Sequence, residues 1–182
     1  MKELSLNILD IAENSVKANA SLIEISITEN EETLEIRISD NGVGMDKNLL
    51  LSVMDPFCTT RTTRKVGMGI PLFKFAAEQT GGNLTISSVF IGDDPENHGT
   101  TTKALFFKNH IDFTPLGDVI SSITTLIQGH ADRDFLFTHR RGERSVNLDT
   151  RELRAILEDV PLDTFEVLEW IRANLEEQYN LI

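Results

Sequence analysis

The chain has 182 residues, of which 40% are hydrophobic, and its formal net charge is −12. A chain of this length and hydrophobic content can bury one core, or one core with a small appended unit. The net negative charge argues against a nucleic-acid partner, because proteins that bind nucleic acids usually carry a basic face. Cys58 is the only cysteine, which excludes an internal disulfide. No apolar run approaches the roughly 18 residues that cross a bilayer, and the chain does not start with a signal peptide, so we expect a cytoplasmic protein with no membrane partner.

Residues 3–19 predict an amphipathic helix, because apolar residues recur along them at helical spacing. The other face of this helix is polar. Asn7, Asp10, Asn14 and Lys17 follow one another at steps of three and four residues, so they form one stripe that a ligand can contact.

Residues 22–28 and 33–39 alternate between apolar and polar and predict two strands of a hairpin, which leads into the turn Asp40-Asn41-Gly42-Val43-Gly44-Met45. A carboxylate at a strand end can accept a hydrogen bond from an exocyclic amine such as that of adenine. Glycines permit a positive φ and a close approach of the backbone to a ligand. Taken alone, the same turn also fits a plain hairpin corner or a fragment of a calcium loop.

Asp46 predicts the start of a short helix through Val53, and the segment from Cys58 to Lys65 is rich in hydroxyls and cations. That composition fits a flap over an anion, or else a solvated surface loop. A redox role for Cys58 needs an exposed, activated thiolate, which the sequence does not establish. Gly67-Met68-Gly69 then leads into a helix from Ile70 to about Gln79, whose first N–H groups suit a phosphate.

Strands are predicted at 84–89 and 100–107, and the pattern changes from His110 onward. We therefore expect two domains, residues 1–109 and a small α-β-β-α-α unit at residues 110–182. The unit's predicted elements are a helix at 115–128 with Thr114-Pro115 at its start, strands at 135–138 and 144–148, and two helices that begin at Asp149 (with Glu152) and Asp163 (with Glu166).

Four segments occur in an order that resembles the Bergerat-fold ATPases, the family of gyrase, MutL, histidine kinases and anti-sigma-factor kinases. They are Asp10/Asn14/Lys17, Asp40-Asn41-Gly42-Val43-Gly44, Asp55-Pro56-Phe57-Cys58-Thr59-Thr60-Arg61 and Gly67-Met68-Gly69-Ile70. The resemblance covers residues 1 to about 108 and is greatest to the ATP-binding domain of histidine kinases, whose last strand likewise starts with a sequence like Gly99-Thr100-Thr101. It implies an α+β two-layer sandwich, the Bergerat fold, with a mixed sheet backed by helices.

The resemblance also implies roles for individual residues. Asn14 is expected to coordinate Mg²⁺, Lys17 to contact the phosphates, and Asp40 to bind the adenine amine of ATP. An amide oxygen is a hard, neutral ligand, which agrees with a site where Mg²⁺ takes few protein ligands beside phosphates. The full set expected to bind ATP is Asn14, Lys17, Asp40, Gly42, Gly44, Met45, Phe57, Thr60, Arg61, Gly67, Met68, Gly69, Ile70 and Thr101.

One position departs from the hydrolytic members of the family. Four residues before the metal-binding Asn they carry a Glu that activates water, whereas this chain has Asp10 there and Glu13 beside Asn14. Asp is shorter by one methylene, and a general base must reach the nucleophile's proton directly or through one water. We take Asp10 and Glu13 as the candidate catalytic residues and expect slow hydrolysis.

Two functions of different classes follow. The first is a signalling phosphotransferase that uses Mg-ATP and acts on a protein partner, either response-regulator-like or anti-sigma-antagonist-like, with a homodimer also open. The second is an ATP-gated interaction module with little or no phosphotransfer. The segment His110-Ile111-Asp112-Phe113-Thr114-Pro115-Leu116 resembles in part the phosphoacceptor motif of sensor kinases, but it follows the ATP-binding domain and lacks the acidic residue after the His. We favour a linker there.

Overall fold

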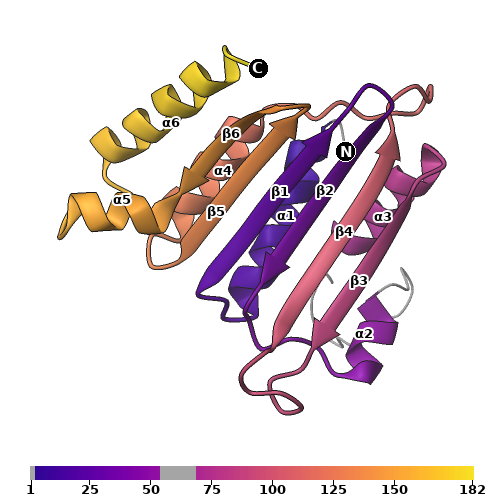
Figure 1. The fold of residues 1–182 in the computed structure, drawn as a ribbon. Helices are drawn as coiled ribbons and strands as arrows, with labels where there is room; N and C mark the ends of the chain where they lie inside the picture. The colour runs from indigo at the N-terminus through magenta and orange to yellow at the C-terminus, as the bar shows by residue number, and fades with distance from the viewer. Residues whose placement is uncertain (1–2, 54–68) are drawn as a thin grey trace.

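The computed structural model describes residues 3–53 and 69–182, which fold into helices α1 to α6 and one six-stranded sheet (Figure 1). In chain order the elements are α1 (Leu4–Lys17), β1 (Leu22–Glu29), β2 (Thr33–Asp40), α2 (Lys47–Val53), α3 (Gly69–Gln79), β3 (Asn83–Val89), β4 (Gly99–Phe107), α4 (Val119–Gly129), β5 (Asp134–Arg141), β6 (Arg144–Asp149), α5 (Thr150–Leu157) and α6 (Phe165–Tyr179). None of the helices in these ranges is long and apolar enough to span a membrane.

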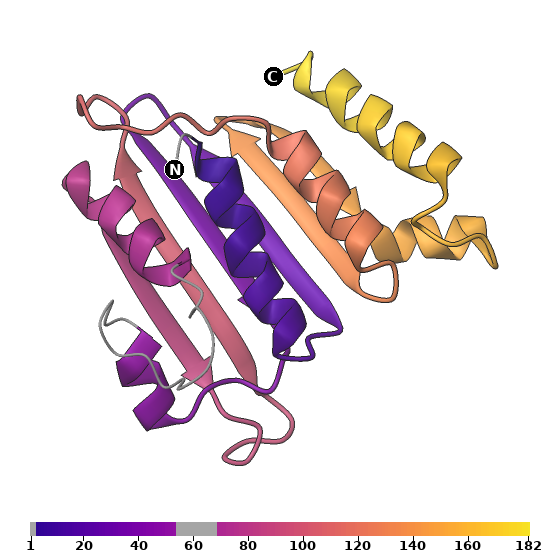
Figure 2. The same ribbon diagram turned by 180° about the vertical axis from the view of Figure 1, so that it is seen from behind.

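The sheet has the strand order β3-β4-β2-β1-β5-β6. Adjacent strands pair antiparallel, except β1 and β5, which pair parallel, so the sheet is mixed. Helices α1, α3 and α4 lie against one face (Figure 2), and the other face is not covered by them (Figure 1). The prediction of an α+β fold with a mixed sheet backed by helices is confirmed.

The alternation in the sequence explains why the helices lie on one face. In β1 the side chains of Ile23, Ile25 and Ile27 are buried, and the residues between them are only partly buried. Successive strand residues point to opposite faces, so this strand presents an apolar row to α1 and a polar row to the open face. Full burial of each such side chain contributes about 1.5–3 kcal/mol.

The N-terminus of α1 is capped by a distant segment. Glu3 at the N-cap makes no side-chain cap bond. Instead the N–H of Leu4 donates to the carbonyl of Pro115 (2.9 Å) and that of Ser5 to the carbonyl of Leu116 (2.8 Å). Two of the four N–H groups that a helix start leaves unpaired are thereby satisfied.

This contact explains why the predicted start of α4 is wrong. The sequence placed it at Thr114-Pro115, but the helix starts at Val119, and the Asp118 carboxylate caps it by accepting from the N–H of Ser121 (2.9 Å). The chain before it cannot be helical, because Gly117 has φ +77° and the two preceding carbonyls bind α1. Local cap signals were overridden by tertiary contacts.

The last two helix starts give one confirmation and one correction. Asp149 caps α5 as predicted, accepting from the N–H of Arg151 (3.0 Å). The last helix was predicted to start at Asp163, but the N-cap of α6 is Thr164, and its side chain makes no cap bond.

The α-β-β-α-α order of the C-terminal segment is as predicted, but its strands do not form a separate sheet. Strand β5 pairs along its whole length with β1, and buried residues from both segments form one core cluster. A boundary at 109/110 remains a prediction. The continuous sheet means that the C-terminal unit is joined to the first unit by strand pairing.

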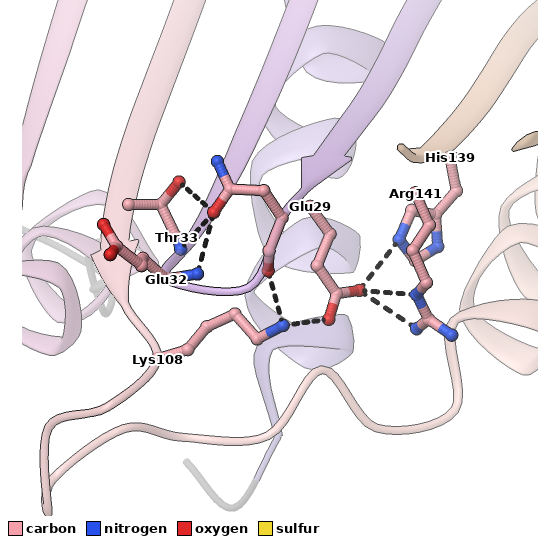
Figure 3. Close-up of polar contacts among 7 residues, drawn as sticks. Glu29, Glu32, Thr33, Lys108, His139 and Arg141 are labelled. Atoms are coloured by element: carbon pink, nitrogen blue, oxygen red, sulfur yellow. Dashed lines mark hydrogen bonds and ion pairs between the residues drawn. The ribbon is translucent and has the colours of Figure 1, made fainter. Parts of the chain in front are cut away.

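A polar network also joins the two segments at one end of the sheet (Figure 3). The Glu29 carboxylate accepts from Lys108 Nζ (2.6 Å) through Oε1, and from Arg141 Nη2 (3.0 Å) through Oε2. Oε2 also lies 3.3 Å from Nε2 of His139, a fully buried side chain, whose Nδ1 lies 2.8 Å from the hydroxyl of Tyr179 in α6.

Burial raises the pKa of Glu29, but the hydrogen bonds from Lys108 and Arg141 outweigh it, and the net pKa is lowered. Burial lowers the pKa of His139, which Glu29 only partly offsets, and burial raises the pKa of the Tyr179 hydroxyl. One arrangement fits all three groups. A neutral His139 donates from Nε2 to Glu29 and accepts at Nδ1 from Tyr179.

Candidate functional site

The Asp40 carboxylate stands at the end of β2 and is held by two donors. The Ser15 hydroxyl of α1 donates to Oδ2 (2.6 Å), and the N–H of Gly42 donates to Oδ1 (2.9 Å). Asp40 itself is only partly buried. An ionised carboxylate accepts about four hydrogen bonds, so it keeps acceptor capacity for a ligand while its orientation is fixed.

The two glycines of the turn are required by packing within the protein. A Cβ at Gly42 would lie 2.7 Å from the carbonyl oxygen of Ala18. Gly44 has φ +68°, and its Cβ would lie 1.9 Å from the carbonyl oxygen of Val89. The N–H of Val43 donates to the Ala18 carbonyl (2.8 Å). The turn is therefore clamped between the end of α1 and the end of β3.

The polar stripe of α1 is present, with one correction. Asp10 and Lys17 are exposed and Asn14 is half-buried, but Asn7, also predicted for this stripe, is only 2% exposed. Successive residues of an α-helix are rotated by about 100° around its axis, so residues three or four apart do not lie in line with one another. Asn7 therefore lies on the side of α1 that packs against the core. Asp10, Asn14 and Lys17 therefore keep one partly or fully exposed polar row along α1.

Helix α3 begins beside Asp10. Its first residue is Gly69, one residue before the predicted start, and Ile70 packs partly buried against the core. A Cβ on Gly69 would lie 3.2 Å from the Cβ of Asp10 and 3.8 Å from its Oδ2. The structure therefore brings the Asp10 carboxylate next to a helix N-terminus, where unpaired N–H groups favour anions.

Glu13 points elsewhere. Its Oε1 lies 2.8 Å from Nε2 of His130, at the end of α4. Glu13 is thus bound to the C-terminal segment, whereas Asp10 faces α3. The two candidate catalytic carboxylates are not brought together.

Thr101 lies away from Asp40. Its hydroxyl is 2.7 Å from that of Ser39, and both belong to the open face, because β2 residues next to each other point to opposite faces. A shallow hollow on that face is lined by Ser39 with Ser26 and Arg37, on the opposite side of the sheet from the Asp40 side chain.

The residue paired with Asp40 is Thr100, which the prediction passed over. Its hydroxyl lies 2.9 Å from that of Ser88, and Ser88 Oγ also accepts from the N–H of Met45 (2.8 Å). Met45 is thus fixed through its backbone.

His98 is another residue that sequence reasoning missed, and its Nδ1 lies 2.5 Å from the Gly42 carbonyl oxygen.

Ser15 is the most informative omission. It follows Leu4, Ile8 and Ile11 at the helical spacing that predicts the packed face of α1, and it is buried there. A hydroxyl among apolar residues on a core-facing row needs a partner, and that requirement was the available signal.

Several predicted site residues lie outside the described residues. They are Phe57, Thr60, Arg61, Gly67 and Met68, together with Cys58 and the rest of the predicted flap.

Residues 2–113 match the family described as histidine kinase-, DNA gyrase B-, and HSP90-like ATPase. This is more than half of the chain, and the chain belongs to this family. The matched part of the chain accordingly contains an ATP-binding domain of this family.

The chain is similar to two curated relatives over about half its length. It is 31% identical over 97 residues to the sensor histidine kinase AtsR of Burkholderia thailandensis, covering 48% of this chain and 16% of that protein. It is 37% identical over 90 residues to the DNA mismatch repair protein MutL of Fervidobacterium nodosum, covering 49% of this chain and 15% of that protein. The chain therefore matches about a sixth of each relative's length.

Among solved structures, the Aquifex aeolicus MutL ATPase domain complexed with ADP has a TM-score of 0.55 and 15% sequence identity, covering 87% of this chain and 70% of that chain. The N-terminal domain of a DNA repair protein also has a TM-score of 0.55, with 18% identity, covering 82% of this chain and 53% of that chain. At such identities the likeness supports the fold alone.

Proposed function

We propose that this protein binds Mg-ATP and acts as a signalling phosphotransferase of the histidine kinase or anti-sigma-factor kinase type on a protein partner. The observation that carries the proposal is the Asp40 carboxylate, fixed by Ser15 and Gly42 at the edge of α1. A fixed, partly exposed acceptor suits the exocyclic amine of adenine, because both of its held oxygens keep free lone pairs.

The phosphate end of the nucleotide is assigned to α1 and to the start of α3. With a net charge of −12, the chain needs local donors to hold an anion. Lys17 is an exposed cation in the last turn of α1, and the first N–H groups of α3 have no partner within the helix.

Asn14 fits Mg²⁺ because its half-buried side chain lies on the polar row of α1 between Asp10 and Lys17 and because amide oxygens are suitable ligands for hard cations. Bound Mg²⁺ would neutralise phosphate charge at this site.

Asp10 is the candidate general base, since it is exposed on the same side of α1 and lies against α3. Its role would be to accept a proton at a carboxylate oxygen from the attacking group. Glu13 is less well placed for this, because His130 holds its carboxylate on the side of the C-terminal segment.

The alternative is an ATP-gated interaction module, in which the C-terminal unit passes nucleotide occupancy to another protein. The contact of that unit with α1 through Glu13 and His130 favours this alternative. In either case we propose a cytoplasmic location, with a partner that is response-regulator-like or anti-sigma-antagonist-like, or a second copy of the chain.

A transfer assay tests the proposal and separates the two functions. The protein would be incubated with γ-labelled ATP and Mg²⁺, alone and with candidate partners, beside its Asp40→Asn variant. Label on a partner that is lost in Asp40→Asn supports the phosphotransferase. ATP binding with no label on any protein supports the module. Failure of the wild type to bind ATP contradicts both.

A further inference from the structure

The connection between α1 and β1, residues 18–21, makes hydrogen bonds to the turn at residues 40–45, which we call the nucleotide turn. The Asn41 side chain accepts from the N–H groups of Ser21 (2.9 Å) and Leu22 (3.0 Å) through Oδ1, and its Nδ2 donates to Ser21 Oγ (2.8 Å). At the start of the same connection, the Ala18 carbonyl accepts from the N–H of Val43 (2.8 Å). The conformation of residues 40–43 therefore depends on where residues 18–22 lie.

The C-terminal segment binds the same connection. Arg133 donates from Nη1 to the carbonyl of Ala20 (3.1 Å), and Ala20 is fully buried. One residue further, the N–H of Asp134 donates to the carbonyl of Ser21 (2.9 Å). Two peptide units of the connection therefore bond at both ends. Their N–H groups, on Ser21 and Leu22, donate to Asn41. Their carbonyls accept from the C-terminal segment.

The loop that carries Arg133 is itself fixed by helix α5. Arg154 donates from Nη2 to the carbonyls of Ala131 (2.5 Å) and Arg133 (2.8 Å), and from Nε to Asp134 Oδ1 (2.8 Å). Three bonds from one guanidinium leave this loop little freedom. A hydrogen-bonded path runs from α5 through residues 131–134 and 20–22 to Asn41.

We propose that Arg133 is a positioning residue for the nucleotide turn. It acts through the Ala20 and Ser21 peptides and Asn41, so the C-terminal unit sets the geometry in which Asp40 meets the nucleotide. A hydrogen bond from a charged donor to a buried carbonyl is stronger than a neutral one, and its loss leaves that carbonyl unpaired. The effect on ATP rests on the proposed function, but the effect on the turn does not.

The first test follows amide hydrogen exchange by NMR in the full chain without nucleotide. Arg133→Ala should speed exchange at the amides of Leu22 and Val43 at least threefold relative to the Ile25 amide in the middle of β1. The matched control is Arg151→Ala, because Arg151 bonds only Asp149 among the described residues. A general loss of stability would speed all three amides alike, and that result, or no change, would overturn the proposal.

The second test is a double-mutant cycle on ATP affinity, measured by calorimetry well below the unfolding temperature. We expect Arg133→Ala and Asn41→Ala each to weaken binding about three- to tenfold. Because they act through one path, the double variant should weaken it by less than the product of the two effects. Independent, multiplicative effects would contradict the path.

The two tests separate the two claims. If the wild type binds no ATP while exchange at Leu22 and Val43 responds to Arg133→Ala, the proposed function is wrong and the positioning of the turn is supported. If ATP binds equally well to wild type and Arg133→Ala, the proposed function stands and the positioning role is overturned.

Discussion

Ser15 and Asp40, 25 residues apart in the chain, are joined by a 2.6 Å hydrogen bond between the helix layer and the sheet. The bond sets the direction of the carboxylate from the α1 side, and the N–H of Gly42 sets it from the turn. Ser15 follows Asn14 in the same helix, so one turn of α1 contributes to both proposed ends of the nucleotide site.

Replacement of Ser15 by Ala should weaken ATP binding about three- to tenfold, because Asp40 loses the donor that orients it. Calorimetry on the folded variant measures the change. The matched control is Ser5→Ala, another buried serine of α1, whose hydroxyl bonds Glu3 instead. Equal affinity in the two variants would mean that Ser15 serves packing alone.

Replacement of Asn14 by Ala should abolish the tightening of ATP binding by Mg²⁺ and leave adenosine binding largely intact, because only the phosphate end loses a ligand. The measurement is ATP affinity with and without Mg²⁺, with adenosine as internal control. A variant that keeps the wild-type response to Mg²⁺ would rule out the metal role.

Hydrolysis by the wild type should be slow, and Asp10→Glu should raise it severalfold. The added methylene extends the reach of the carboxylate toward the attacking group's proton. Phosphate release at saturating ATP gives the rate, and Asp10→Asn, which has no base, should fall below the wild type. A slower Asp10→Glu enzyme would show that Asp10 is set for another task.

Stability should fall with acid below pH 6.5 because of His139. Its pKa is lowered in the folded protein, chiefly by burial, so between its folded pKa and the ordinary value of 6.5 the unfolded chain binds the extra proton. The contribution of neutral His139 to the free energy of unfolding is therefore fully present above pH 6.5. It is lost as the pH falls toward the folded pKa, at a rate approaching about 1.4 kcal/mol per pH unit. The charged groups that face this ring are Glu29, Arg141 and Lys108.

Urea unfolding at pH 7.5 and 5.5 measures this effect. The His139→Gln variant, which does not titrate, should lose less stability between the two values than the wild type does. His110→Gln removes an exposed histidine and should behave as the wild type. Glu29, whose pKa is also lowered, adds its own loss only below its ordinary value of 4.5. The same slope in His139→Gln and wild type would contradict a neutral buried histidine.

Short-range patterns were enough to predict much of the fold. The apolar spacing of α1, the alternation of β1 and β2, and the placement of Asp40 at a strand end are properties of neighbouring residues, and the structure has all three. The cap at Asp149 belongs to the same class, because its bond partner, Arg151, is two residues away.

What the sequence missed depends on contacts between distant segments. Alternation shows that β5 is a strand but does not show that β1 is its partner. The start of α4 shifted because the carbonyls of residues 115 and 116 are used by α1. The face on which Thr101 lies also depends on pairing: its partner is Ser39, whereas Thr100 is the partner of Asp40, and in a strand one residue changes the face.

The central claim is that Asp40 binds the adenine amine, and Asp40→Asn tests it most directly. The Asn amide must keep its oxygen toward the N–H of Gly42, so its NH₂ group takes the place of Oδ2. That group is a hydrogen-bond donor, and the adenine amine that it would meet is also a donor. We predict a loss of ATP affinity of about 1–3 kcal/mol by calorimetry. Asp118→Asn is the matched control, because Asp118 likewise accepts one N–H and one serine hydroxyl. Unchanged ATP affinity in folded Asp40→Asn protein would contradict the assignment.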